Sequence, residues 1–147
     1  MNDQVQAELK KIFNSRFSTS ESTRANYARG EDTYDPILSK AVIFPETNEE
    51  VSKILSLCNQ HKIPVVPFGT GTSLEGNVVG NEKGITISLE KMNKILNVNA
   101  EDFDCRVQAC VTKEQLNEYL REDGVFFPID PGANAAIGGM ASTSASG

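Results

Sequence analysis

The chain has 147 residues with 20 acidic and 14 basic side chains, a formal net charge of −6. That length allows one domain that buries roughly two-thirds of its unfolded surface, and the acidic balance disfavours nucleic acid, whose binding depends on neutralising phosphates. No run approaches the ~20 apolar residues that span a bilayer, there is no secretion signal, and three cysteines with one histidine are too few for a zinc or iron–sulfur site. We therefore expect a cytoplasmic protein without a membrane span or a metal.

The N-terminal part predicts a helix followed by a polar lead-in. Apolar residues recur at helical spacing from about Asp3 to Asn14. Residues 15–35 are polar, with one short helical turn expected near residues 24–28.

A strand, a helix and a second strand come next. Residues 41–44 predict a strand, and Thr47 with Glu50 forms a capping box for a helix that runs to about His61. A further strand at residues 65–66 completes an order typical of a parallel β-α-β unit with a right-handed crossover.

The second half indicates a meander and a helix. Alternating apolar and polar residues predict three strands, at residues 85–89, 95–98 and 103–109, which we expect to be antiparallel neighbours in a meander. Thr112 and Gln115 form a second capping box, Gly124 marks the end of that helix, and residues 125–127 predict a last strand. The expected fold class is α+β, with two small α/β subdomains.

No side chain shows the pattern of a catalytic group. His61 lies in the last turn of its helix, where a structural role is expected. Cys58 falls on an apolar helix stripe, and Cys105 and Cys110 lie in or beside a strand, so packing is expected for all three. The acidic pairs at residues 49–50 and 101–102 look like a helix start and a turn.

The segment Pro64–Gly76 predicts a short strand followed by a loop whose first residues have small side chains; its sequence is P-V-V-P-F-G-T-G-T-S-L-E-G. Gly69 and Gly71 permit the backbone conformations that expose successive amides. The loop holds no Lys or Arg. We interpret it as a nest of amides around a pyrophosphate, whose charge is met by peptide dipoles.

Two known phosphate loops do not fit, and one plain alternative remains. A Walker loop needs Lys and Ser or Thr after its last glycine, where this chain has Asn77 and Val78. The dinucleotide fingerprint fails at Leu74, which occupies its third glycine position. A glycine-rich connection without any ligand is the alternative.

The C-terminal stretch Pro128–Gly147 is also made mostly of small residues. A flexible tail is one interpretation. Yet Pro131-Gly132 and Gly138-Gly139 specify particular bends. Two small-residue surfaces in one chain suggest a single extended ligand that contacts both.

These motifs resemble a known family. P-F-G-T-G-T-S-x-x-G, I-T-I-S-L, F-F-P-x-D-P-G-A and G-G-M-A-S-T-S-A-S-G are similar to the PCMH-type FAD-binding domain of the FAD-linked oxidases, nearest to the D-lactate dehydrogenase (cytochrome) and glycolate oxidase branch. The resemblance runs from about Arg24 to the end. It implies an N-terminal helix and lead-in over residues 1–36, a flavin domain over 37–147 with FAD between its two subdomains, and a missing C-terminal part followed by a substrate domain.

The resemblance also implies cofactor-binding residues in three segments. The first comprises Pro67, Phe68, Gly69, Thr70, Gly71, Thr72, Ser73, Gly76 and Asn77. The second and third comprise Asp130, Pro131, Gly132, Ala133, Asn134, Ala135 and Ala136, then Gly139, Thr143, Ser144, Ala145 and Ser146. Some members attach FAD through a histidine where this chain has Thr72, so non-covalent FAD is expected. The family's V-x-P-G-V-T motif is matched only in part by V-Q-A-C-V-T at residues 107–112, where Cys110 replaces the glycine.

The function implied is the FAD-binding portion of a flavin-dependent D-2-hydroxy acid dehydrogenase of the D-lactate or glycolate class. Hydride would pass from substrate C2 to flavin N5 and electrons onward to an acceptor such as cytochrome c or a quinone, and the fragment alone would be inactive. The alternatives are another FAD-linked oxidase, of the D-2-hydroxyglutarate dehydrogenase or alkyl-glycerone-phosphate synthase type, and a non-catalytic remnant that binds a nucleotide or a partner.

Overall fold

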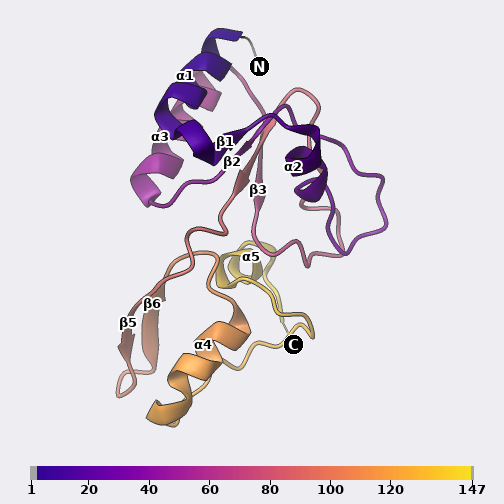
Figure 1. Cartoon of the computed structure of the whole chain (residues 1–147). Helices are drawn as coiled ribbons and strands as arrows, with labels where there is room; N and C mark the ends of the chain where they lie inside the picture. Colours follow the sequence, from indigo (N-terminus) through magenta and orange to yellow (C-terminus); the bar gives the residue numbers. More distant parts are fainter. Residues whose placement is uncertain (1–2, 147) are drawn as a thin grey trace. The chain divides into compact units, whose positions relative to one another are not determined.

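The computed structural model describes residues 3–146 and divides the chain into two compact units, Met1–Lys91 and Met92–Gly147 (Figure 1). The start of the flavin domain expected at residue 37 stays a prediction. It is a different boundary from the one between the two compact units, which falls after Lys91. Residues before 37 belong to the first unit, because Val5, Leu9 and Phe13 are buried in its core.

The first unit contains a mixed sheet with helices packed against it. Its elements are α1 (Asp3–Phe13), the 3-10 helix η1 (Asn14–Arg16), β1 (Phe17–Ser18), α2 (Glu21–Asn26), β2 (Val42–Ile43), α3 (Asn48–Gln60), β3 (Val65–Phe68) and β4 (Ile85–Ser88). The strand order is β1-β2-β4-β3. β1 is antiparallel to β2, and the other neighbours are parallel. The core joins the apolar faces of α1 and α3 to the sheet, and both helices lie on the same side of it (Figure 1).

The N-cap and the apolar stripe predicted for α3 are confirmed, but the capping box is only half formed, because the Glu50 carboxylate accepts from the Glu46 amide instead. The Thr47 side chain accepts a hydrogen bond from the Glu50 amide at 3.2 Å and so caps the helix. Cys58 is buried among core residues, as its place on the apolar stripe predicted. His61 follows the last helical residue and is exposed.

The position of β4 differs from the prediction. The alternation in residues 85–89 suggested an antiparallel meander strand, whereas β4 lies between β2 and β3 and is parallel to both. All four of its residues are buried, including Thr86 and Ser88. The Thr86 hydroxyl donates to Ser39 Oγ at 2.8 Å, which satisfies a polar group inside the core. The parallel relation of β2 and β3 is confirmed, but they are not neighbours.

The second unit is built from a hairpin and two helices. Its elements are β5 (Ile95–Asn99), β6 (Asp104–Val107), α4 (Lys113–Leu120), the 3-10 helix η2 (Arg121–Asp123) and α5 (Ile137–Thr143). β5 and β6 are antiparallel with an irregularity between Ile95 and Asn97, so this part of the meander is confirmed. A small core contains Val111, Leu116 and Leu120.

The ends of α4 follow the sequence signals. The Thr112 side chain accepts from the Gln115 amide at 3.2 Å, and Gly124 takes the left-handed conformation with φ +69° after η2. Cys110 is buried as expected, but the packing role expected for Cys105 is wrong, because that side chain is exposed on β6.

Two predictions for the end of this unit are wrong. Residues 125–127 form no strand within the described chain; instead the Asn117 side chain accepts from the Phe127 amide at 2.7 Å and donates to its carbonyl at 3.3 Å. The bend expected at Gly138-Gly139 is also wrong, because both residues lie within α5, a helix that no sequence signal predicted. Across residues 3–146, none of the helices combines the length and apolarity that a membrane crossing requires.

Candidate functional site

The first candidate segment, called here the glycine loop (residues 67–77), leaves the sheet at the end of β3. β3 ends at Phe68, whose carbonyl accepts a hydrogen bond from the Leu89 amide at 2.9 Å. Residues 69–84 then form bends and turns with no helix. The loop therefore continues without a helix, as the sequence predicted. It differs in this from Walker and dinucleotide loops, which are each followed directly by a helix.

The glycine loop presents backbone donors that the fold does not use. Within the described residues, the amides of Gly69, Gly71, Thr72 and Ser73 donate to no acceptor of the protein. Such successive amides in a turn form a concave site for an anion. The donor set of the loop therefore fits a phosphate group.

Gly71 has a conformation that other residues adopt at a cost. Its φ is +76° and it is buried. A β-carbon at this position would come within 2.8 Å of Cζ of Phe68. Its carbonyl accepts a hydrogen bond from the Glu31 amide at 3.0 Å. The backbone thus bends sharply here and could not carry a side chain without moving Phe68.

The hydroxyls of the loop lie close to one another. Thr70 Oγ1 and Thr72 Oγ1 are 3.4 Å apart. Ser73 Oγ accepts a hydrogen bond from the Asn77 side-chain amide at 2.8 Å. This bond ties Asn77 to the loop in which the resemblance had placed it. The structure therefore brings together the residues of the first segment as one compact loop.

The second candidate segment, residues 130–136, belongs to the second unit and is tied to the start of α4. Asp130 accepts from Lys113 Nζ at 2.6 Å and from the Gly132 amide at 3.0 Å. The bond from Lys113 lowers the pKa of the Asp130 carboxyl below its usual value. Asn134 and Glu114 exchange two hydrogen bonds, at 3.2 and 2.9 Å.

These contacts argue against a flexible tail. The segment also pairs through its backbone, since the Lys113 amide donates to the Ala135 carbonyl at 3.0 Å and Thr112 and Ala136 form an isolated antiparallel bridge. Sequence reasoning missed Lys113, which places a cation on the segment. The sequence shows Lys113 next to the cap residue Thr112, but not its contact with Asp130, because that contact depends on how the chain turns 17 residues later.

The third candidate segment lies in and after α5. The hydroxyl of Thr143 donates to the Gly139 carbonyl at 3.0 Å, so it serves the helix itself. Ser144 has φ +52° and ends the helix, and the Ala145 amide bonds the Met140 carbonyl at 3.0 Å. Ser146 is exposed.

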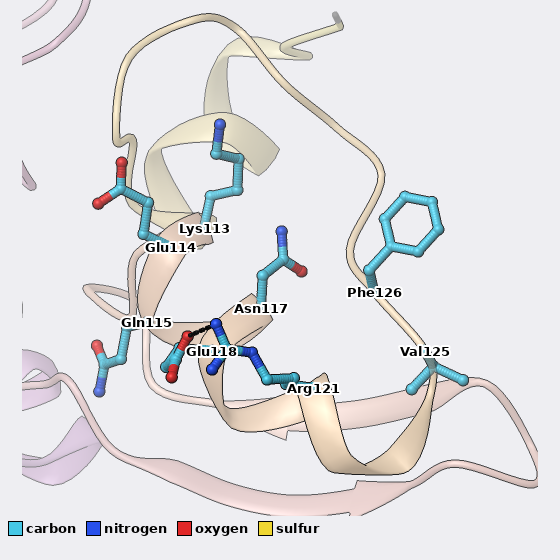
Figure 2. A pocket seen from close by; sticks show the side chains of 8 residues that line it. All are labelled: Lys113, Glu114, Gln115, Asn117, Glu118, Arg121, Val125 and Phe126. Carbon is cyan, nitrogen blue, oxygen red and sulfur yellow. Dashed lines mark ion pairs between the residues drawn. The ribbon is translucent and has the colours of Figure 1, made fainter.

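A shallow hollow lies along α4 and the segment after Gly124 (Figure 2). Its lining includes Glu118 and Arg121, which form an ion pair at 3.2 Å, and the exposed ring of Phe126. None of these residues belongs to a candidate segment. Its open shape and mixed charge do not match a cofactor cleft, which is usually enclosed and mostly apolar.

Comparison with protein families gives one match that covers most of the chain. The family described as "FAD binding domain" matches residues 39–147. The chain belongs to this family. FAD is accordingly its cofactor, and the chain holds a PCMH-type flavin-binding fold, as the sequence motifs implied.

Several relatives of this FAD-binding domain are named as D-lactate dehydrogenases. A zebrafish (Danio rerio) protein named "Probable D-lactate dehydrogenase, mitochondrial" is 43% identical over 130 residues, which are 88% of this chain and 26% of that protein. The "D-lactate dehydrogenase [cytochrome], mitochondrial" of Arabidopsis thaliana is 38% identical over 96% of this chain and 25% of its own length. The chain therefore spans about a quarter of the length of these relatives.

Solved structures share the fold at lower identity. An alkyldihydroxyacetonephosphate synthase superimposes on all of this chain and 33% of its own, with a TM-score of 0.90 and 22% identity. A p-cresol methylhydroxylase with bound substrate superimposes on 83% of this chain and 25% of its own, with a TM-score of 0.72 and 22% identity.

The cytoplasmic location expected from the sequence is contradicted. The relatives from zebrafish, Arabidopsis and two yeasts are all named as mitochondrial proteins. Composition alone could not reveal this, because a net charge of −6 contains no information about the compartment to which a protein is targeted.

Proposed function

We propose that this chain is the FAD-holding portion of a flavin-dependent D-2-hydroxy acid dehydrogenase of the D-lactate or glycolate class. When bound, the flavin would supply the redox chemistry, as the acceptor of a hydride from the hydroxy acid, and the glycine loop would hold its pyrophosphate. The observation that carries the proposal is the glycine loop, in which the amides of Gly69, Gly71, Thr72 and Ser73 donate to no acceptor among residues 3–146.

The part of this chain is to bind and orient. The pyrophosphate is anionic and the glycine loop contains no Lys or Arg, so the amides of Gly69, Gly71, Thr72 and Ser73 are the groups that would meet its charge. Residues 130–136 and 139–146 remain candidates for other parts of the cofactor. We propose that 37–147 is the flavin domain and that FAD is held without a covalent bond, since Thr72 offers no imidazole for attachment.

The names of the relatives support the wider setting. Those named as cytochrome-linked D-lactate dehydrogenases favour a small 2-hydroxy acid as substrate and cytochrome c, or else a quinone, as electron acceptor for the whole protein. They also favour a mitochondrial location. A relative named as a glycolate oxidase subunit supports the glycolate class of the proposal. Another, named as a D-2-hydroxyglutarate dehydrogenase, keeps that substrate class as an alternative.

Reconstitution tests the proposal. The chain is mixed with FAD, desalted, and its absorbance is measured at the flavin bands. We expect a yellow protein with flavin retained in about equimolar amount. A colourless product would contradict the proposal and favour a remnant that binds another nucleotide or a protein partner.

A further inference from the structure

The glycine loop is contacted by a segment that precedes the sheet, residues 29–34. The closest approach is at Gly30, where a β-carbon would come within 2.9 Å of the Gly71 carbonyl oxygen and 2.7 Å of Cγ2 of Val78. The next residue, Glu31, donates its amide to that same carbonyl at 3.0 Å. The segment thus holds the loop at the point where its backbone bends.

A second contact lies at the other end of the loop. Gly76 has φ +71°, and a β-carbon on it would come within 2.7 Å of Cδ2 and 2.8 Å of Cε2 of Tyr34. The ring of Tyr34 therefore lies directly against the Gly76 backbone. The Tyr34 amide donates to Asp32 Oδ1 at 3.0 Å, which fixes the turn that carries the ring.

The two sharp bends of the loop are thus both covered by aromatic rings. Phe68 lies against Gly71, and Tyr34 lies against Gly76. The Phe68 ring is itself held edge to face by the Tyr27 ring, with centroids 5.2 Å apart. Tyr34 differs from the other two rings because it is 61% exposed, so it adds little to the core.

We propose that Tyr34 is a positioning residue for the flavin: it fixes the glycine loop in its anion-binding conformation before the cofactor arrives. This rests on the proposed function. A loop that is already ordered loses less conformational entropy when it binds, so the ring strengthens binding without touching the ligand. No sequence signal indicated this role, because Tyr34 lies 42 residues before Gly76 in a polar stretch.

The test compares three variants of the whole chain. Tyr34→Ala removes the ring, Tyr34→Phe keeps it, and Tyr119→Ala removes a tyrosine of similar exposure, 59%, from α4 of the second unit. Two quantities are measured: hydrogen exchange of the backbone amides of residues 69–79 without cofactor, and the dissociation constant of FAD from quenching of its fluorescence. Thermal unfolding is followed for each variant as a check on the fold.

For Tyr34→Ala we expect faster exchange in the glycine loop and at the Val79 amide just after it, which donates to the Gly76 carbonyl at 3.1 Å. We also expect FAD binding to be weakened about tenfold. Tyr34→Phe and Tyr119→Ala should match the unaltered chain in both measurements. Unchanged loop exchange in Tyr34→Ala, or faster exchange with unchanged affinity, would overturn the proposal. If the unaltered chain binds no FAD, the proposed function fails, and loop exchange alone decides whether Tyr34 positions the loop.

Discussion

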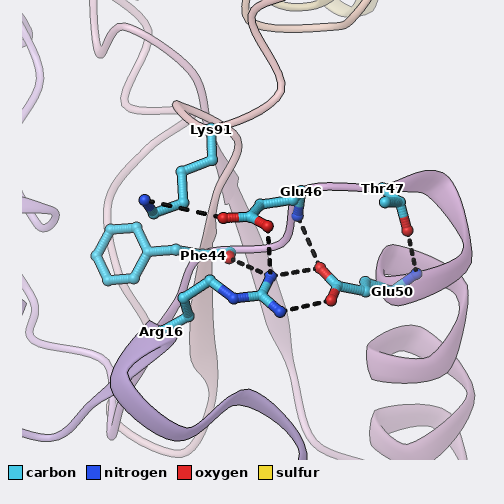
Figure 3. A network of polar contacts seen from close by, with 6 residues as sticks. All are labelled: Arg16, Phe44, Glu46, Thr47, Glu50 and Lys91. Carbon is cyan, nitrogen blue, oxygen red and sulfur yellow. Dashed lines mark hydrogen bonds and ion pairs between the residues drawn. The ribbon is translucent and has the colours of Figure 1, made fainter.

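Arg16 donates two parallel hydrogen bonds to the carboxylate of Glu50, at 2.5 and 2.6 Å, across 34 residues of sequence (Figure 3). Glu50 also accepts from the Glu46 amide at 2.8 Å, and Arg16 donates to the Phe44 carbonyl at 3.2 Å. The pair thereby links the segment after α1 to the first turn of α3. Glu50 was predicted to complete a capping box, and its carboxylate instead serves this network.

The Arg16 contact makes stability depend on pH. Hydrogen bonding from Arg16 lowers the pKa of Glu50 from 4.5 to about 2. A carboxyl with a depressed pKa in the folded state stabilises the protein above its unfolded pKa, and this contribution is lost as pH falls from about 4.5 towards 2. We expect Glu50→Gln to cost about 2 kcal/mol at pH 6, with a smaller difference from the unaltered protein at pH 3. Urea unfolding at both pH values measures this, and a difference that does not change with pH would contradict it.

Gly71→Ala should abolish flavin retention. The substitution strains a backbone with φ +76° and forces Phe68 away from the loop. Gly124→Ala is the matched control, because its φ is +69° but, apart from its chain neighbours, no atom of the described residues lies within 4 Å of the added carbon. Both variants should lose about 1 kcal/mol of stability from the backbone alone, whereas only Gly71→Ala should lose FAD after desalting. Equal retention by the two variants would argue against the loop as the binding site.

Thr72 leads to a prediction about how the cofactor is attached. Precipitation of the reconstituted protein with acid should leave all flavin in the supernatant, because no histidine is available in the glycine loop. A yellow pellet after washing would show a covalent bond and refute this expectation.

Gly84 and Gly139 should respond to alanine in opposite directions. A β-carbon on Gly84 would lie 2.4 Å from the Pro64 carbonyl oxygen, which accepts the Ile85 amide where β3 and β4 begin to pair. We expect Gly84→Ala to destabilise the first unit by at least about 2 kcal/mol. Gly139 lies within α5, and beyond its chain neighbours and the backbone of that helix no described atom lies within 4 Å of an added carbon. Alanine should therefore stabilise the helix by up to about 1 kcal/mol. Thermal unfolding measures both, and a loss at Gly139 as large as that at Gly84 would be inconsistent with these contacts.

Features set by local chemistry could be predicted from the sequence. The hydroxyls of Thr47 and Thr112 cap their helices, and Gly124 ends the second of these. Gly71 takes the positive φ that the loop was expected to need. In each case the residue type alone favours the observed conformation.

Features set by distant contacts could not. In the sequence, Thr86 suggests a strand with one polar, solvent-facing side. In the structure it is buried at the centre of the sheet, where its hydrogen bond to Ser39 satisfies the hydroxyl. The helix α5 contains Gly138 and Gly139, which lower helix propensity. It is held by bonds from the Ile137 and Gly138 amides to the carbonyls of Val111 and Ala109, both 2.8 Å. Tertiary contacts therefore override the local signal at both places.

The most direct test of the account follows backbone amide resonances of the whole chain, labelled with nitrogen-15, as FAD is added. The account predicts that the largest changes fall on Gly69, Gly71, Thr72 and Ser73, whose amides the fold leaves unused. If these four resonances stay in place while lysine or arginine side chains respond to the cofactor, then main-chain donors do not hold the pyrophosphate and the account is contradicted.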